Sequence, residues 1–398
     1  MPSTLPVGLK WPADSRIPAL DLAKRTFHAY VHIPFCLARC GYCDFNTYTS
    51  DELNGDLRSG FDKHLALEIE RSVKVLEESG YPHRNLSTIF FGGGTPSLFT
   101  SNQFATVMAA LERSFGFADG IEVTTEANPE STSPELLTSL HALGVNRLSM
   151  GVQSFDEDVL AVLDRSHSKD HVPPLVRSAQ ELGYEVSIDL IYGAPGESLE
   201  SWRETVERAI ELGTDHISAY SLIVEPGTKL ERRIRRGEVA LVDEDLNALK
   251  YELATQLFEQ AGLEWYEVSN WGKPSEHNSA YWASQDWWGY GPGAHSHLSG
   301  NRFWNQKHPT VYQGAIGQGL AVAGREELTE RQILEERLML GLRTLAGVPR
   351  TLFRDLAVEP SKVANAISAG YLSMSSDRVV VTRAGRLLID GLVLDFLS

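Results

Sequence analysis

Short apolar runs alternate with longer amphipathic stretches over the first 225 or so residues. The runs lie at residues 29–33, 88–91, 121–126, 147–151, 186–191 and 216–223. Helical patterns separate them at residues 65–78, 102–114, 134–143, 175–182 and 201–212. Strands that alternate with helices predict βαβ units and a parallel sheet with right-handed crossovers. We therefore expect an α/β fold, a partial TIM-like (βα)6 barrel over residues 28–225, although a flat doubly wound sheet fits the same periodicity.

The pattern changes after this barrel core. Residues 226–324 hold a turn and a basic stretch at 226–237, a helix at 244–260, and a Trp-, Tyr- and Gly-rich segment from 265 to 304. We interpret them as an extension of the barrel. Residues 325–398 show a helix at 327–345, a helical stretch at 361–369 and a strand at 378–382. They predict a small, mostly helical, winged-helix-like C-terminal domain with a β-hairpin wing, and residues 1–27 form an N-terminal arm.

Charge and hydropathy argue against a nucleic-acid partner and against a membrane-spanning segment. The formal net charge of −17 repels phosphate backbones, so we expect no nucleic-acid partner. The first residues lack a basic segment followed by an apolar run, and no stretch approaches roughly 18 uninterrupted apolar residues. We therefore expect a cytoplasmic protein with no transmembrane segment.

The chain has three cysteines, and all of them fall within one short segment just after the first predicted strand. An odd number at such tight spacing argues against a disulfide framework. Three thiolates on one loop, Cys36, Cys40 and Cys43, can hold three irons of a [4Fe-4S] cluster. The fourth iron would stay open for an outside chelate, such as the amino and carboxylate groups of S-adenosylmethionine (SAM). Zinc with His32 as a fourth ligand is a weaker interpretation, because structural zinc usually takes four ligands in paired motifs. Unliganded thiols are the remaining alternative.

Polar residues stand at the ends of the later predicted strands. Glu126 ends the third strand, Gln153 follows the fourth and Asp189 lies on the fifth, while Arg165 sits past the next helical stretch. A polar residue in an apolar strand costs stability unless it has a partner. Each alone could simply bond a loop backbone. Because the carboxyl ends of barrel strands face the active site, the four together predict a ligand site.

A glycine run ends the second predicted strand, at residues 92–94. Glycines let the backbone approach a ligand closely, and the N–H groups there can meet a carboxylate. Ordinary tight turns use glycines too.

These motifs together resemble a known family. Cys-x3-Cys-x2-Cys after the first strand is the motif of the radical SAM superfamily. The preceding Tyr30-x-His32-x-Pro34-Phe35 makes the chain similar to the oxygen-independent coproporphyrinogen III oxidase family, from about residue 28 to 390. The resemblance implies a [4Fe-4S] cluster on the three cysteines and reductive cleavage of SAM to a 5′-deoxyadenosyl radical. It implies SAM contacts at Tyr30, Tyr42, Gly93, Gly94, Thr95, Glu126, Gln153, Arg165 and Asp189.

Two features depart from the oxidase itself. The oxidase has a fourth cysteine two residues after the third, whereas Asp44 and Phe45 follow Cys43 here. The N-terminal arm of about 27 residues is also short for closing over a porphyrinogen. Both differences put decarboxylase activity in doubt.

A second motif points to another branch of the family. Residues 276–282 carry His-Asn-x-x-Tyr-Trp, which resembles the haem chaperone branch. His277 is the implied haem ligand, and His295, in a glycine-spaced loop, is another candidate. A buried, hydrogen-bonded histidine is the ordinary alternative. Flat apolar surface for a porphyrin would come from Tyr281, Trp282, Trp287 and Trp288, unless these rings seal the barrel mouth instead.

The resemblance favours a haem chaperone that binds haem beside a [4Fe-4S]/SAM centre and delivers it to acceptor proteins, including membrane-associated respiratory enzymes. The alternatives are a coproporphyrinogen III dehydrogenase and a radical SAM enzyme with another substrate. The basic residues 229–236 can bind porphyrin propionates or an acidic partner, but a solvated helix surface is the better explanation of them.

Overall fold

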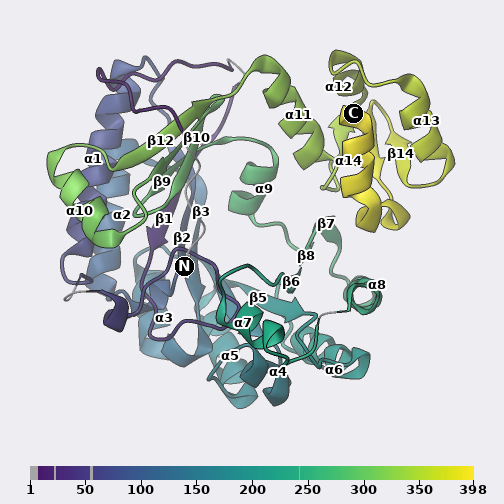
Figure 1. The fold of residues 1–398 in the computed structure, drawn as a ribbon. Helices are drawn as coiled ribbons and strands as arrows, with labels where there is room; N and C mark the ends of the chain where they lie inside the picture. Colours follow the sequence, from purple (N-terminus) through teal and green to yellow (C-terminus); the bar gives the residue numbers. More distant parts are fainter. Residues whose placement is uncertain (1–7, 22–23, 54–56, 242) are drawn as a thin grey trace.

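A long mixed β-sheet organises the molecule. The structure is a computed structural model that describes residues 8–21, 24–53, 57–241 and 243–398. Within these residues, one sheet of twelve strands has the order β12-β11-β10-β9-β1-β2-β3-β4-β5-β6-β8-β7 (Figure 1). Its central strands are β1 (Phe27–Ile33), β2 (Leu86–Gly93), β3 (Phe117–Ala127), β4 (Arg147–Gln153), β5 (Glu185–Tyr192) and β6 (His216–Ser221).

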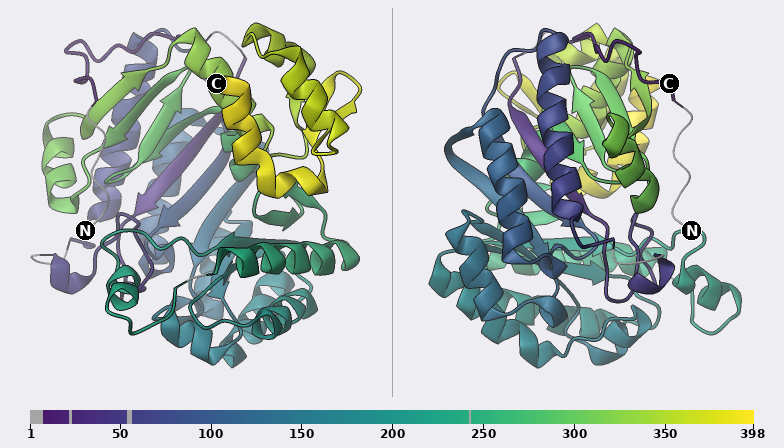
Figure 2. Two further views of the ribbon diagram at one scale, coloured as in Figure 1. Left: turned by 45° about the vertical axis from the view of Figure 1, so that its right-hand side comes forward. Right: turned by 90° about the vertical axis from the view of Figure 1, so that its left-hand side faces the viewer.

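The six central strands are parallel and follow chain order. Right-handed crossovers between strands in this order place every helix on one face, whereas a doubly wound sheet would reverse its order at a switch point. Figure 2 shows the helices on the outer side of the strands. They are α1 (Phe61–Glu78), α2 (Ser101–Phe115), α3 (Pro134–Ala142), α4 (Glu157–Val162), α5 (Val172–Leu182) and α6 (Leu199–Glu211). The predicted α/β barrel-like fold is confirmed.

Local sequence explains why these elements begin and end where they do. Strand β1 is buried at six of seven positions, as expected for a parallel strand covered on both faces. Helix α2 begins at a capping box in which Thr100 and Gln103 satisfy each other's backbone N–H groups. Helix α5 ends at Gly183, whose φ of 91° suits a left-handed helix cap.

Both edges of the sheet extend beyond the predicted barrel. On the β1 side lie β9 (Asp286–Tyr290), β10 (His295–Leu298), β11 (Asn301–Asn305) and β12 (Val322–Glu327), and on the β6 side lie β7 (Trp265–Glu267) and β8 (Asn270–Gly272). Strand β9 runs parallel to β1. Trp288 on β9 is 1% exposed and packs edge-on against Phe303. The expectation that Trp288 offers its face to a porphyrin is therefore wrong.

The remaining helices flank the extended sheet. They are α7 (Lys229–Arg235), within the predicted basic stretch, α8 (Glu244–Gln260), α9 (Glu276–Trp282) and α10 (Pro309–Gln318). The longest described helix, α1, has 18 residues. No helix in the described ranges is both apolar and long enough to cross a bilayer.

The C-terminal region forms a separate small sheet with helices. Its strands β13 (Val348–Pro349), β14 (Leu372–Ser375) and β15 (Arg378–Val381) pair in the order β13-β15-β14. The β14–β15 hairpin is the predicted wing. Around it lie α11 (Glu330–Gly341), α12 (Arg350–Asp355), α13 (Pro360–Ser368), the 3-10 helix η5 (Arg383–Leu388) and α14 (Ile389–Leu397). The helix predicted from residue 327 begins later, because β12 continues to Glu327 and Thr329 caps α11.

Candidate cofactor cavity

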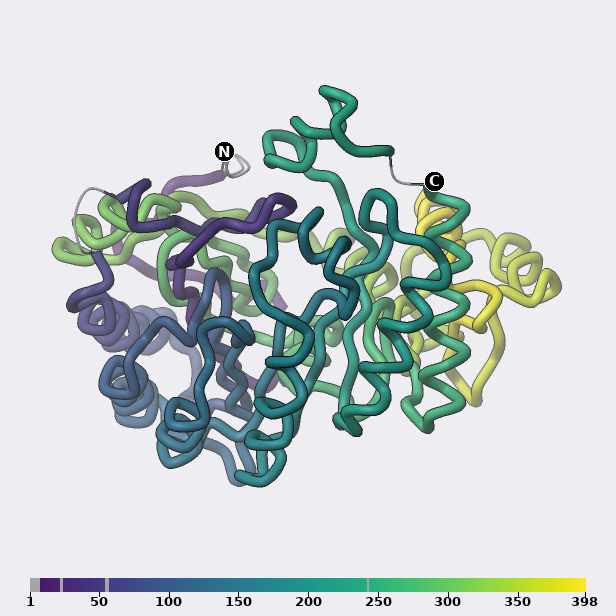
Figure 3. Tube along the Cα trace, turned by 90° about the horizontal axis from the view of Figure 1, so that it is seen from below, coloured from purple at the N-terminus to yellow at the C-terminus, as the bar shows by residue number. Residues whose placement is uncertain are grey.

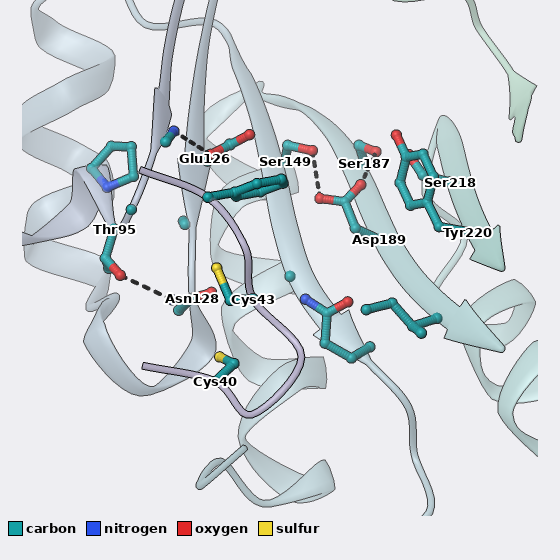
Figure 4. Close-up of a pocket in the computed structure, with 18 of the residues that line it drawn as sticks. Cys40, Cys43, Thr95, Glu126, Asn128, Ser149, Ser187, Asp189, Ser218 and Tyr220 are labelled. Atoms are coloured by element: carbon teal, nitrogen blue, oxygen red, sulfur yellow. Dashed lines mark hydrogen bonds between the residues drawn. The ribbon is translucent and has the colours of Figure 1, made fainter. Parts of the chain in front are cut away.

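A cavity of about 670 Å³ lies on the sheet face that the helices leave uncovered. Its lining residues alternate along the strands, as Arg147, Ser149 and Gly151 do on β4, because alternate side chains of a strand share a face. Figure 4 shows part of this lining. The cavity is lined by the residues predicted to bind the cluster and SAM and by the first candidate haem ligand: Cys36, Cys40, Cys43, Tyr30, Tyr42, Gly93, Gly94, Thr95, Glu126, Gln153, Arg165, Asp189 and His277.

The cysteine loop leaves β1 and returns beside it. The Cys36 N–H donates to the carbonyl of Tyr48 at 3.0 Å, and the Tyr48 N–H donates to that of Pro34 at 2.7 Å. Farther along the loop, the Gly41 N–H donates to Leu163 O at 3.2 Å, and Gly41 O accepts from the Leu230 N–H at 2.8 Å. The loop is thus fixed between the ends of α4 and α7, with three half-buried thiols on the cavity wall.

Asn46 is an anchor of this loop that sequence reasoning missed. Its Nδ2 donates to the carbonyls of Pro292 and Lys307, both at 2.9 Å, and its own carbonyl lies 2.9 Å from His32 Nε2. Gly291, in the turn after β9, has a φ of +100°, and a Cβ there would stand 2.5 Å from the His32 carbonyl. The glycine-spaced loop therefore supports the cysteine loop. His295, at its end, is exposed and lies outside the cavity lining.

The surroundings of the thiols argue against a single zinc ion. Both ring nitrogens of His32 are in hydrogen bonds, to the Tyr30 hydroxyl at 2.9 Å and to Asn46 O. Among the described residues, no three His, Cys, Asp or Glu side chains are grouped to hold one metal ion. A [4Fe-4S] cluster makes a different demand, because each thiolate binds its own iron.

Polar groups around the loop fit a cluster bound by thiolates. Thr95 Oγ1 donates to Cys36 Sγ at 3.7 Å, and Arg165 Nη1 donates to Cys40 Sγ at 3.6 Å. Such donors stabilise negative sulfur. Burial raises the pKa of the Cys36 thiol and raises the pKa of Cys43 to about 11, so metal binding would have to displace these protons. Within the described part of the chain, the buried polar atoms on or beside the loop that lack a hydrogen-bond partner include Arg39 Nε, Thr47 Oγ1, Asp164 Oδ2 and Arg165 Nε.

The glycine run of β2 packs against the cysteine loop. The Gly94 N–H donates to Ile33 O and the Thr95 N–H donates to Phe35 O, both at 2.8 Å. A Cβ at Gly94 would lie 2.6 Å from the Phe35 carbonyl, so a larger residue would displace the loop. These two N–H groups are therefore already occupied by the loop and do not await a ligand carboxylate.

Two carboxyl groups with a raised pKa line the cavity (Figure 4). Glu126 accepts the Gly93 N–H at 2.9 Å, and burial raises the pKa of this carboxyl to about 7. Asp189 accepts from the hydroxyls of Ser149 at 2.7 Å and Ser187 at 3.3 Å, and burial raises its pKa as well. A cationic ligand such as a sulfonium or an amine would favour the ionised form of both groups.

Arg165 and Gln153 line the cavity wall at the end of β4. Arg165 Nη2 donates to Asn128 Oδ1 at 3.0 Å, to Glu130 Oε2 at 3.2 Å and to Gly151 O at 2.9 Å. Gln153 adopts a φ of +65°, a left-handed conformation that is unusual for a non-glycine residue. Strain of this kind often accompanies a ligand site.

His277 lies at the deep end of the cavity, on α9. The first turn of this helix is capped by the Glu122 carboxylate, which accepts the backbone N–H groups of Glu276 at 2.8 Å and His277 at 2.9 Å. The His277 ring is 1% exposed; its Nδ1 lies 2.5 Å from Thr88 Oγ1 and its Nε2 lies 2.8 Å from the Tyr281 hydroxyl. Iron ligation by this ring, which stays a prediction, would require one of these hydrogen bonds to break.

Comparison with known proteins identifies the family of the chain. A family model described as the Radical SAM superfamily matches residues 30–209, and one described as the HemN C-terminal domain matches residues 328–388. The solved structure of the coproporphyrinogen III oxidase HemN from Escherichia coli, described as a radical SAM enzyme, has the same fold. The TM-score is 0.81 at 24% identity, covering 94% of this chain and 91% of that one. The fold and cysteine loop together define a radical SAM protein.

Similar curated proteins show to which family within the superfamily the chain belongs. "Heme chaperone HemW" from Mycobacterium tuberculosis is 43% identical over 96% of this chain and 97% of its own length. The protein of the same description from Bacillus subtilis is 34% identical over 90% and 96%. The chain belongs to the HemN-like family of the radical SAM superfamily. Membership in the superfamily implies a [4Fe-4S] cluster and SAM as cofactors.

Proposed function

We propose that this protein is a haem chaperone that binds a [4Fe-4S] cluster, SAM and haem, and delivers haem to acceptor proteins. Respiratory enzymes, some of them membrane-associated, are the proposed acceptors. The similarity to proteins described as haem chaperones over nearly the whole chain supports it. The observation that carries it is the composition of one cavity, which is lined both by the three cysteines and by His277 and Tyr281 of α9.

The cofactors are assigned to the residues that fit them. Cys36, Cys40 and Cys43 are proposed to hold the cluster, which supplies one electron to SAM when both are bound. Glu126 and Asp189 would accept hydrogen bonds from the amino or hydroxyl groups of SAM and offset the charge of its sulfonium. Both carboxyl groups line the cavity and have a raised pKa, so a cation bound there would favour their ionised forms. The other proposed SAM contacts are Tyr30, Tyr42, Gly93, Gly94, Thr95, Gln153 and Arg165.

Haem titration of the anaerobically reconstituted protein tests the function. We expect a Soret band that saturates with haem, and transfer of that haem to an apo-acceptor. A control without reconstitution shows whether the cluster is needed. Failure of wild-type protein to take up haem would overturn the proposal. Conversion of coproporphyrinogen III to protoporphyrinogen IX with SAM and reductant would favour the dehydrogenase instead.

Two substitutions test His277 as the haem ligand. His277→Ala should shift the Soret band and weaken haem binding. Tyr281→Phe removes the hydroxyl on Nε2, so it should leave haem binding equal or tighter, because the ring no longer has to break that hydrogen bond. His171, an exposed histidine outside the cavity, gives the matched control His171→Ala. Equal spectra for His277→Ala and wild type would remove His277 as the ligand.

A further inference from the structure

A continuous row of hydrogen bonds follows the deep wall of the cavity. Ser187 Oγ donates to Asp189 Oδ1 at 3.3 Å (Figure 4), and His216 Nδ1 lies 2.7 Å from the same Ser187 oxygen. On its other side, His216 Nε2 lies 2.9 Å from the Tyr266 hydroxyl, which accepts an N–H from Asn278 Nδ2 at 3.3 Å. The row therefore joins β5 to helix α9.

The partners fix where each proton lies. Asn278 Nδ2 also donates to the Glu267 carboxylate at 3.1 Å, which sets the orientation of the amide. The Tyr266 oxygen accepts from that amide and from the Ser275 N–H at 3.4 Å, so its own proton points to His216 Nε2. A neutral imidazole has one N–H, which must then be on Nδ1. The Nδ1–H group donates to the Ser187 oxygen, and the Ser187 hydroxyl in turn donates to Asp189.

We propose that His216 and Tyr266 are positioning residues that couple SAM bound at Asp189 to haem bound near helix α9. The inference rests on the proposed function for both ligands. Without the Tyr266 hydroxyl, the imidazole proton can move to Nε2. The Ser187 hydroxyl then turns to the vacated Nδ1 acceptor, and Asp189 loses that donor while keeping Ser149. Haem that shifts Asn278 on binding would disturb the hydrogen bond between Asn278 and the Tyr266 hydroxyl, and so change the donors to Asp189. Because binding free energies are linked, haem and SAM would each change the affinity for the other by the same factor.

The strand that carries Tyr266 is also bonded to the C-terminal region. The Leu345 N–H donates to the carbonyl of Tyr266 at 2.8 Å, and Thr344 forms an isolated antiparallel β-bridge with Glu267. The guanidinium of Arg386 stands 4.0 Å above the Trp265 ring. Figure 3 shows the C-terminal region beside this side of the barrel. The position of Tyr266 therefore depends on both parts of the molecule.

Tyr266→Phe tests the coupling with little change in shape. In reconstituted wild-type protein, the SAM dissociation constant should change by about fivefold or more when haem is added, as is typical of coupled sites. In Tyr266→Phe, SAM binding without haem should weaken by about threefold to tenfold, and the effect of haem should disappear. Tyr184→Phe is the matched control, because this buried hydroxyl donates to Leu137 O at 2.7 Å outside the cavity lining.

A spectroscopic measurement tests the proton placement independently of both ligands. In the full chain labelled with ¹⁵N-histidine, His216 should show only the Nδ1–H tautomer in wild type and a populated Nε2–H tautomer beside it in Tyr266→Phe, with His216→Asn assigning the signal. An unchanged tautomer together with wild-type SAM affinity would overturn the inference alone. A lack of haem effect on SAM affinity in wild type would do the same. If wild-type protein binds no SAM or no haem, the proposed function fails and the coupling fails with it.

Discussion

Arg165 donates one hydrogen bond to the sulfur of Cys40 and, through its other terminal nitrogen, three more to Asn128, Glu130 and the Gly151 carbonyl. The guanidinium thus joins the cysteine loop to the ends of β3 and β4. Its side chain is 3% exposed, so its charge is offset by Glu130 and the surrounding acceptors. One residue therefore affects both the folded structure and the charge at a cluster sulfur.

Arg165→Met should change both properties. Loss of the donor to Cys40 should make the reduction potential of the reconstituted cluster more negative, because hydrogen bonds to the sulfurs stabilise the reduced form. The free energy of unfolding should fall by about 3 kcal/mol, because partners of a buried charge are left unmatched. An EPR-monitored redox titration and urea denaturation measure the two effects. An unchanged potential in Arg165→Met would show that the Cys40 contact has no electronic role.

Asn46→Ala should loosen the cysteine loop from the turn after β9. The part-buried carbonyl of Pro292 would lose its donor and that of Lys307 would keep only the Tyr48 hydroxyl at 3.4 Å, at a cost of about 1–3 kcal/mol. We expect less iron per chain after reconstitution and faster loss of cluster colour in air. Asn85→Ala, which removes a single exposed bond to Phe117 O, serves as the control. Equal iron content in the two variants would mean that the loop holds its shape without Asn46.

Glu126 should make stability depend on pH in the cofactor-free protein. Its pKa is about 7 in the folded state against 4.5 ordinarily, so the folded protein keeps a proton that the unfolded chain releases between these values. The free energy of unfolding therefore falls as pH rises through this window, by about 3 kcal/mol for this group. Glu126→Gln removes the titration and should gain stability relative to wild type between pH 5 and pH 8. Urea denaturation at both pH values, with the exposed Glu112→Gln as control, measures the difference. A constant gap between Glu126→Gln and wild type would contradict the raised pKa.

The buried pair of Lys250 and Glu197 gives a fourth prediction. Lys250 Nζ lies 2.7 Å from the Glu197 carboxylate, and the two side chains are 1% and 0% exposed. Lys250→Met leaves that carboxylate buried without its cation, which should cost about 3–5 kcal/mol in urea denaturation. The double variant Lys250→Met/Glu197→Gln should recover much of the loss, because no uncompensated charge remains. If the double variant is as unstable as the single one, packing around Lys250 matters more than its charge.

The central strands and the cavity residues could be predicted from the sequence because their signals are local. Each of the six parallel strands is an apolar run followed by a helix. The three cysteines lie within one short segment, and Glu126 and Asp189 are acidic residues within predicted strands. The family resemblance assigned the cysteines and these acidic residues to one cofactor site, and the structure places them around one cavity.

The remaining features depend on contacts between distant residues. The edge strands β7 and β8 have three residues each in a Gly- and Trp-rich segment, which is too short for an alternating pattern. Asn46 bonds a carbonyl 246 positions away, and nothing in its neighbourhood marks that partner. His277 was predicted to hold haem, but sequence could not reveal that both of its ring nitrogens have hydrogen-bond partners.

The anchors of the cysteine loop also set an order of events during synthesis. All three cysteines have been synthesised by residue 43. The distant hydrogen-bond partners that anchor their loop are Leu163, Leu230, Pro292 and Lys307. Domains generally form as the chain emerges from its N-terminal end. A nascent chain therefore carries three accessible thiols for most of its translation, exposed to oxidants and to the wrong metals. If these thiols hold the proposed cluster, we expect stable binding of iron and sulfide only after residue 307 has left the ribosome.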